Sequence, residues 1–242
     1  MNSQPLNSLS QEYFRQASER YGVNFENLTL IGGLENFVYS FQKNNRDYVL
    51  RVGHSTHLSF ELVQAEIDWL LYLVDGDVPV TQPVPSDSGA YVEKIVINET
   101  YLNVVAFEKV EGQHLDFGTP NEWNKDIIRQ WGRNVGRMHA LTKNYTPRSS
   151  FRRYDFEPLM DVERLLSHKG KEIVERITSL FHELEELPKT KDSYGLIHSD
   201  LHPGNFLVDS KKKKIVCLLD FDRACYKWFI SEIAVALYYP LY

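Results

Sequence analysis

The chain is poor in cysteine, in long apolar runs and in excess positive charge. Its 242 residues include only two cysteines, Cys217 and Cys225, too few for a disulfide framework, and this scarcity favours a reducing compartment. No apolar run approaches the ~20 residues that a membrane-spanning helix needs. The first residues lack the basic and then apolar regions of a secretion signal. We therefore expect a cytoplasmic protein that does not bind a membrane.

The charge balance argues against a nucleic-acid partner. Lys and Arg number 27 and Asp and Glu number 33, so the net charge is −6, whereas a general nucleic-acid binder carries a basic surplus. The one basic block, Lys211–Lys214, lies between two apolar segments, and we interpret it as the solvated tip of a hairpin. The rest of the composition, 43% hydrophobic and 25% charged, is that of an ordinary globular protein.

Two halves of different character can be distinguished along the chain. In residues 1–110, short apolar runs alternate with turn residues, and this pattern predicts a β-rich lobe with two helices. We expect strands at 28–31, 37–41, 48–52, 91–97 and 102–107, helices at 10–20 and 58–74, and a proline-rich loop at 78–85. The sequence contains no internal repeat.

Residues 111–242 have mainly helical periodicity. An apolar stripe from Trp123 to Leu141 predicts a long helix, in which Trp123, Trp131 and Met138 face the core. Further helices are expected at 158–168, at 171–187 and from 229 onward, with short strands at 195–198, 206–208 and 215–220. The fold class predicted is α+β, with a β-rich nucleotide-binding lobe (1–110) and a larger helical catalytic lobe (111–242).

The strongest chemical signal is the octapeptide HSDLHPGN at residues 198–205. Pro203 and Gly204 make it a turn-rich loop after a short apolar strand, and it presents Asp200 and Asn205. A second strand delivers Asp220 at its end, so three oxygen ligands converge. Phosphoryl transfer needs a carboxylate that orients the attacking hydroxyl, and oxygen ligands that hold Mg²⁺ on the nucleotide phosphates. A His-x-Asp-x-His metal cluster of a hydrolase is the alternative interpretation of the same loop.

These two segments resemble known kinases. HSDLHPGN matches the protein-kinase catalytic loop His-Arg-Asp-Leu-Lys-x-x-Asn, and its His-Pro-Gly-Asn ending resembles the aminoglycoside phosphotransferase and choline kinase superfamily. Leu219-Asp220-Phe221-Asp222 is similar to that superfamily's Ile-Asp-Phe-Asp. The resemblance implies a two-lobed protein-kinase-like fold, with Asp200 as catalytic base and with Asn205 and Asp220 as Mg²⁺ ligands. It makes His198 a packing residue, and gives His202 either a phosphate-neutralising or a turn-stabilising role.

Upstream segments agree with this resemblance. Residues 32–39 resemble the superfamily's Gly-Gly-x-x-Asn-x-Val-Tyr pattern, which implies that ATP binds at Gly32, Gly33, Asn36 and Val38; alone they would indicate a hairpin turn. Arg51 stands where kinases carry a lysine, and it adds a planar fork for phosphate. Glu66 is the partner expected for Arg51, and Glu61 on the same predicted helix is its rival.

The remaining predictions concern the adenine and the acceptor. Residues 107–110 fit a hinge between lobes, where backbone groups of Glu108 and Val110 would meet the adenine edge. Arg148, Arg152 and Arg153 form a basic cluster that could contact an anionic substrate or a partner, but we expect it to face water. Glu232 occupies the place of an Asp in the superfamily's Tyr-Asp-x-Ala motif, and we expect it to replace that residue structurally.

The predicted reaction is transfer of the ATP γ-phosphate to a hydroxyl group of a small molecule. The Asp-Phe-Asp form and Arg51 resemble the homoserine-kinase-like and bacterial stress-kinase branch. A protein Ser/Thr kinase of the stress-kinase type is an alternative, although no Ala-Pro-Glu motif follows Asp220. A non-catalytic nucleotide-binding scaffold is another. Relatives usually continue with more helices after this point, so we expect a fragment or an abbreviated acceptor pocket; the sequence does not indicate an oligomeric state.

Overall fold

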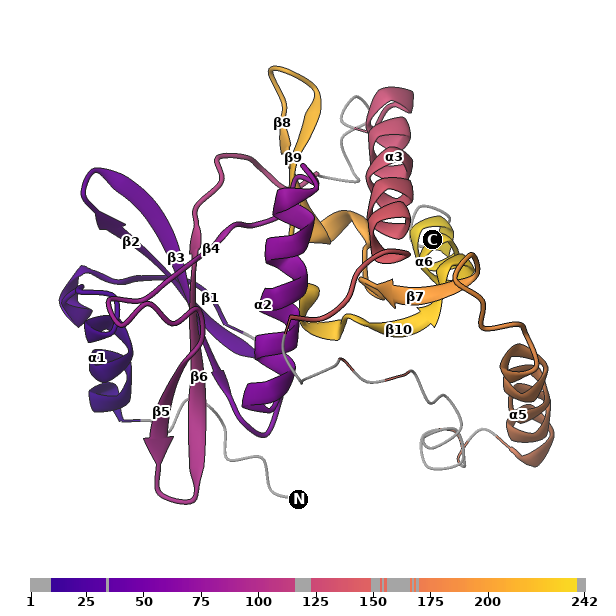
Figure 1. The fold of residues 1–242 in the computed structure, drawn as a ribbon, viewed down its shortest axis with the longest axis horizontal. Helices are drawn as coiled ribbons and strands as arrows, with labels where there is room; N and C mark the ends of the chain where they lie inside the picture. Colours follow the sequence, from indigo (N-terminus) through magenta and orange to yellow (C-terminus); the bar gives the residue numbers. More distant parts are fainter. Residues whose placement is uncertain are drawn as a thin grey trace.

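The computed structural model describes residues 10–33, 35–115, 123–148, 153, 155, 166, 168 and 170–238. A large antiparallel sheet and helix α1 (Gln11–Glu19) lie on one side of the molecule, further helices and two short two-stranded sheets lie on the other, and helix α2 (Phe60–Asp75) runs between them (Figure 1). The α+β class expected from the sequence is therefore confirmed.

The large antiparallel sheet is the main element of the first lobe. Its strand order is β1-β2-β3-β6-β4, with β5 also paired to β6. Asn44 and Asn45 connect β2 to β3 with φ of 53° and 59°, the left-handed pair that a tight hairpin turn requires. The strands are β1 (Thr29–Gly33), β2 (Asn36–Lys43), β3 (Arg46–His54), β4 (Pro83–Val84), β5 (Glu93–Ile97) and β6 (Thr100–Glu108).

The prediction of a loop over the whole proline-rich segment 78–85 is wrong in part. Pro83 and Val84 form the short strand β4 and pair with Phe107 and Ala106. A proline is tolerated there because an edge strand does not need every N–H group for the ladder.

Helix α1 (Gln11–Glu19) covers one face of this sheet. The Ser10 side chain caps it by accepting a hydrogen bond from the Glu12 backbone N–H at 3.3 Å, as expected for an N-cap serine. Phe14 and Ala17 of the helix are buried against the sheet. The core cluster formed there also contains Tyr39, Phe41, Leu50, Val52, Ile95 and Leu102.

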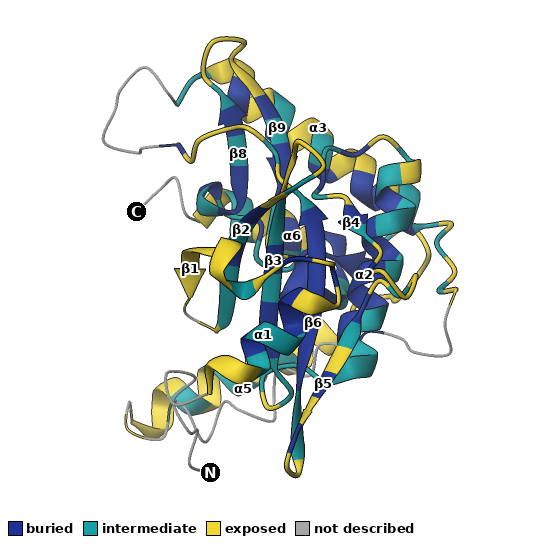
Figure 2. Cartoon of the chain, turned by 90° about the vertical axis from the view of Figure 1, so that its left-hand side faces the viewer, coloured by how far each residue is buried: buried dark blue, intermediate teal, exposed yellow. Residues whose placement is uncertain are grey.

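Helix α2 (Phe60–Asp75) joins the two halves of the chain. Its buried side chains, among them Trp69, Leu70 and Leu73, belong to one cluster with Leu196, Leu201 and Phe221 of the second half. Each large apolar side chain buried in this way contributes about 1.5–3 kcal/mol. The helix is thereby held firmly between the sheet and the loops of the second half, and buried residues are concentrated in α2 and β6 (Figure 2).

The second half contains helices α3 (Lys125–Thr142), α5 (Lys171–Glu185) and α6 (Phe229–Tyr238). The Asn124 side chain caps α3, so Trp123, which was predicted to lie in this helix, precedes it instead. Trp123 still packs in the core, with its ring centroid 5.8 Å from that of Trp131. The helix predicted at 158–168 lies outside the described residues.

Two small antiparallel sheets position the loops of the second half. β7 (Tyr194–Ile197) pairs with β10 (Cys225–Trp228), and β8 (Phe206–Asp209) pairs with β9 (Lys214–Leu218). β10 was not predicted, because its four residues show no clear alternation. The lysine run lies at the turn between β8 and β9, as expected. Among the described residues, no helix is both long and apolar enough to cross a bilayer.

Candidate active site

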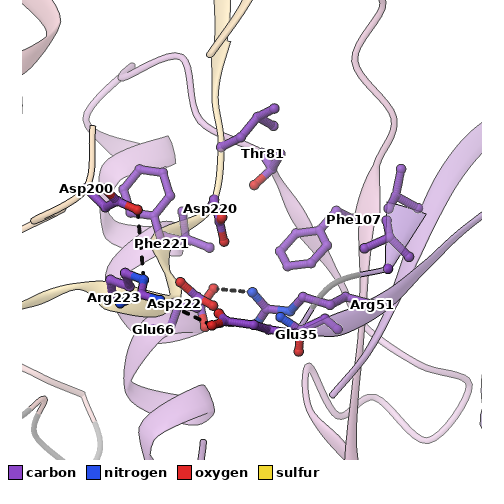
Figure 3. A pocket seen from close by; sticks show the side chains of 16 residues that line it. Glu35, Arg51, Glu66, Thr81, Phe107, Asp200, Asp220, Phe221, Asp222 and Arg223 are labelled. Atoms are coloured by element: carbon purple, nitrogen blue, oxygen red, sulfur yellow. Dashed lines mark hydrogen bonds and ion pairs between the residues drawn. The ribbon is translucent and has the colours of Figure 1, made fainter. Parts of the chain in front are cut away.

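A cavity of about 530 Å³ lies between the large sheet and the loops that follow β7 and β9. One part of its wall is apolar, with Val49, Phe107 and Leu219, and another part carries charged groups, with Arg51, Asp200 and Asp220. Figure 3 shows Phe107 beside Arg51, and the three aspartates Asp200, Asp220 and Asp222 across from them. This volume suits a small ligand, and the division of the wall suits one with a flat apolar end and an anionic end.

Arg51 and Glu66 form a bidentate ion pair at the charged end. Arg51 Nη1 and Nη2 donate to Glu66 Oε1 and Oε2 at 2.7 and 2.9 Å. The Glu66 side chain is only 1% exposed and that of Arg51 13%, so water screens the pair little. The partner of Arg51 is therefore Glu66, whereas Glu61 lies in the first turn of α2 with a half-buried side chain.

The loop after β7 presents Asp200 to the cavity. His198 is fully buried, and Ser199 has φ of 71°, a left-handed conformation that a serine adopts only where its surroundings impose it. Glu232 of α6 provides this constraint, because its Oε2 accepts hydrogen bonds from the backbone N–H groups of His198 and Ser199 at 2.7 and 3.3 Å. Burial raises the pKa of Glu232. The structural role expected for Glu232 agrees with these contacts.

The residues predicted to bind a metal ion meet near Asp200. Asn205 is buried, and its Nδ2 donates to the Asp200 carbonyl oxygen at 2.8 Å, which leaves its amide oxygen as the group that could bind a cation. Asp220 has left-handed φ of 63° and lines the cavity. Burial, together with the charge of Asp222, raises the pKa of Asp220 to about 6. Of the two predicted ligands, Asp220 lines the cavity and Asn205 does not. A carboxylate and an amide oxygen are nevertheless the kinds of oxygen ligand that fit a hard divalent ion such as Mg²⁺.

Asp222 is part of the same charged group. It is 5% exposed, and His57 Nε2 lies 3.0 Å from its Oδ2. Burial acts to raise the pKa of Asp222, but the hydrogen bond with His57 and the charge of Arg51 outweigh it, so the pKa lies below its ordinary value. Of the two neighbouring carboxyls Asp220 and Asp222, Asp222 is therefore the one that loses its proton at the lower pH. The same hydrogen bond raises the pKa of His57.

The other predicted nucleotide-binding residues divide into two sets. Gly33, Asn36 and Val38 line the cavity, but Gly32 does not. Glu108 and Val110 do not line it either; Phe107, one residue before them, does. The Glu108 backbone N–H donates to Gln82 O at 2.9 Å, so that group is already engaged. Adenine contacts with the Glu108 carbonyl and with Val110 stay a prediction.

His202 has a visible role in its own turn. Its Nδ1 accepts a hydrogen bond from the Gly204 backbone N–H at 3.0 Å, and it does not line the cavity. Burial lowers the pKa of His202, which favours the neutral ring at neutral pH. These observations favour turn stabilisation over phosphate neutralisation.

The expectation that the arginine cluster faces water is wrong for Arg153. This side chain is 2% exposed, and its Nε donates to Ala224 O at 2.5 Å and its Nη1 to Leu62 O at 3.1 Å. Its Nη2 donates to Asp222 O. Arg148 has an exposed side chain that pairs with Asp75 at 3.1 Å, and Arg152 lies outside the described residues. Arg153 thus connects α2 to the Asp220–Asp222 segment.

Sequence reasoning missed several residues of this site: Glu35, His57, Thr81, Asp222 and Arg223. The second acid of Asp-Phe-Asp and the arginine directly after it are the only local signals. His57 contacts Asp222, which is 165 positions further along the chain, and no sequence pattern predicts such a contact.

Comparisons with known proteins agree with this geometry. Residues 27–242 match the model of the phosphotransferase enzyme family. The amicoumacin kinase of Bacillus subtilis (strain 168) is 32% identical over 236 residues, which cover 96% of this chain and 68% of that protein.

Solved structures show the same relationship. An amicoumacin kinase in complex with AMP-PNP, Ca²⁺ and Ami superposes with a TM-score of 0.86 and 30% identity, over 95% of this chain and 68% of the other. A microcompartment-associated aminopropanol kinase gives a TM-score of 0.75 and 27% identity, over 94% and 74% of the two chains. The protein therefore belongs to the phosphotransferase enzyme family.

Proposed function

We propose that this protein transfers the γ-phosphate of ATP to a hydroxyl group of a small molecule that also carries an amine. The observation that supports this most directly is the opening of Asp200, Asp220 and the Arg51–Glu66 pair into one cavity. The relatives named above, a kinase of amicoumacin and a kinase of aminopropanol, support a small hydroxyl acceptor. Three aspartates at the charged end of the cavity favour a cationic acceptor over an anionic one.

The chain's own residues would divide the work between positioning and charge. Asp200 orients the acceptor hydroxyl and takes its proton as the new O–P bond forms and the bond from Pγ to the β-phosphate oxygen breaks, which releases ADP. Arg51, fixed by Glu66, holds the phosphates that remain on the nucleotide after the transfer. Asn205 and Asp220 would hold Mg²⁺, which supplies charge neutralisation on the phosphate oxygens.

The apolar end of the cavity would receive adenine. Val49, Phe107 and Leu219 provide the apolar wall there, and Gly33 at the end of β1 permits close approach of the backbone to the phosphates. We also place the reaction in the cytoplasm; the two buried, unbridged thiols Cys217 and Cys225 support this location.

The test is phosphate transfer from radiolabelled ATP across a panel of acceptors. Amicoumacin, 1-amino-2-propanol, homoserine, choline, an aminoglycoside and a generic protein substrate are offered in parallel, with Mg²⁺ and with EDTA. Labelled product is expected with an amine-bearing small molecule, only when Mg²⁺ is present, and Asp200→Asn should form it about 10²–10⁴ times more slowly. Transfer to the protein substrate alone would overturn the proposal, and so would the absence of transfer to any of them.

A further inference from the structure

Glu35 reaches across the cavity from one lobe to the other. It lies between β1 and β2, and its Oε1 is 3.2 Å from Arg223 Nη2, a residue 188 positions further along the chain. Its other oxygen, Oε2, is 3.5 Å from His57 Nε2. The carboxylate is thus held between two groups that can carry positive charge, and it lies in the wall of the cavity itself.

Arg223 also faces the candidate base. Its Nε lies 3.9 Å from Asp200 Oδ2, so one guanidinium group spans Asp200 on one side and Glu35 on the other (Figure 3). In an in-line transfer, the phosphoryl group that moves lies between the acceptor hydroxyl, which the base orients, and the rest of the nucleotide. Arg223 is therefore placed beside the path of the group that moves.

His57 is held in position by its other contact. Its Nε2 lies closer to Asp222 Oδ2, at 3.0 Å, than to Glu35 at 3.5 Å, so its hydrogen bond goes mainly to Asp222 and its contribution to Glu35 is charge. The three groups Glu35, His57 and Asp222 could in principle surround a cation. The guanidinium of Arg223 beside Glu35 disfavours a cation there and favours an anion.

We propose that Arg223, assisted by His57, forms the binding site for the terminal phosphate of a nucleoside triphosphate, and that the Glu35 carboxylate occupies this site until the nucleotide displaces it. This inference rests on the proposed function, because it assigns a further part of the same nucleotide site. Guanidinium groups bind carboxylate and phosphate oxygens with the same planar geometry, so one anion can replace the other.

The ion pair between Glu35 and Arg223 is weak enough for a phosphate group to displace Glu35. The side chains of Glu35 and Arg223 are 49% and 57% exposed, and ion pairs this exposed are weak. Of the described groups, Arg51 is instead held by the buried Glu66, so it would stay in place while Arg223 exchanges Glu35 for phosphate. Glu35 would therefore act as an internal competitor that lowers the apparent affinity for triphosphate in proportion to the time it occupies the site.

The test compares two nucleotides by calorimetry on the full chain, with Mg²⁺ present: AMP-PNP, which has the third phosphate, and ADP, which lacks it. Glu35→Gln removes the competing charge and keeps the size of the side chain. It should tighten AMP-PNP binding about 3- to 10-fold and leave ADP binding unchanged. Arg223→Gln should weaken AMP-PNP by at least about 10-fold and again leave ADP unchanged, as loss of a charge-assisted contact predicts.

Matched controls separate the site from general surface charge. Glu99→Gln, in the exposed turn between β5 and β6, and Arg129→Gln, whose side chain is 69% exposed on α3, should change neither affinity. The double variant Glu35→Gln/Arg223→Gln should bind AMP-PNP no better than Arg223→Gln, because the gain depends on Arg223.

The outcomes also distinguish the inference from the function on which it rests. Weaker AMP-PNP binding by Glu35→Gln, or equal changes for AMP-PNP and ADP, would overturn the competitor role and leave the phosphotransferase proposal standing. Failure of the unaltered protein to bind either nucleotide would overturn the proposed function, and this inference with it.

Discussion

His198 Nε2 lies 2.7 Å from the carbonyl oxygen of Leu219. This contact ties the side chain two positions before the candidate base Asp200 to the backbone one position before the candidate metal ligand Asp220. Asn205 adds a second connection, because its backbone carbonyl accepts a hydrogen bond from the Leu219 N–H at 2.8 Å. The two loops therefore form one unit, and the geometry between base and metal ligand does not depend on either loop alone.

Asp220→Ala should abolish the dependence of nucleotide binding on Mg²⁺. Asp220 is the carboxylate of the predicted ligand set, and oxygen ligands with charge are what Mg²⁺ requires. Calorimetric titration of AMP-PNP with and without Mg²⁺ measures the effect. Asp192→Ala is the control, since that side chain is 88% exposed on a distant loop. A Mg²⁺ dependence that survives in Asp220→Ala would contradict the metal assignment.

Asp200→Asn should separate catalysis from binding. We expect turnover with the best acceptor to fall by about 10²–10⁴, the usual effect of losing a general base, while the dissociation constant of AMP-PNP stays the same. Initial rates and calorimetry on one preparation give both quantities. If turnover stays near that of the unaltered protein, the proton of the acceptor goes to another group.

The local parts of this site could be predicted from the sequence. Asp200, Asn205 and Asp220 lie on short loops whose residue order is itself informative, and Arg51 and Glu66 lie on a strand and the helix that follows it. Their mutual distances then depend on a few neighbouring elements. Helix α1 and the hairpin turn at Asn44 and Asn45 were predictable for a similar reason, because caps and tight turns depend on adjacent residues.

Long-range contacts could not be predicted in this way. Arg153 seemed a solvent-facing member of an arginine-rich segment, yet it is buried because three backbone carbonyls converge on it from α2 and from residues 222–224. Glu35 and Arg223 meet only because the two lobes close over the cavity. Charged residues give no periodic signal of burial, so tertiary geometry decides their roles.

Arg153→Met should destabilise the protein by at least about 2 kcal/mol. The change leaves the carbonyl groups of Leu62, Asp222 and Ala224 without this donor, and each buried group left unsatisfied costs about 1–3 kcal/mol. Urea unfolding followed by circular dichroism measures the loss. Arg148→Met is the matched control from the same segment and should change stability by less than about 0.5 kcal/mol, because its pair with Asp75 is exposed. Equal effects of the two changes would contradict the structural role of Arg153.

Glu66→Gln should lower both stability and nucleotide affinity. It leaves Arg51 without its buried counter-charge, and breaking a buried ion pair typically costs about 3 kcal/mol or more. Arg51 would then turn toward Asp220 and Asp222, away from the phosphates. Urea unfolding and AMP-PNP titration measure the two effects, with Glu61→Gln on the same helix as the control. A stable variant with unchanged affinity would show that Glu66 does not hold Arg51 in place.

His139 should make the protein less stable in mild acid. It is 9% exposed, stacks on Phe229 with ring centroids 4.5 Å apart, and its Nε2 has no hydrogen-bond partner among the described residues. Burial, with a smaller contribution from the charge of Lys143, lowers its pKa from 6.5 to about 4. Between these two values the unfolded chain binds the proton and the folded chain does not, so stability is complete above pH 6.5 and is lost as the pH falls toward 4.

This linkage predicts a difference between variants. From pH 7.5 to pH 5, the free energy of unfolding of the unaltered protein should fall by about 2 kcal/mol more than that of His139→Gln, which has no such proton to bind. Urea unfolding at both pH values measures the difference. His182→Gln is the control, because that histidine is 63% exposed on α5 and should leave the pH dependence unchanged. If His139→Gln loses as much stability in acid as the unaltered protein, other groups are responsible. The Glu232 carboxyl, 4.0 Å from His139 Nε2, acts in the opposite direction, because its raised pKa makes the folded state bind the proton more readily than the unfolded one.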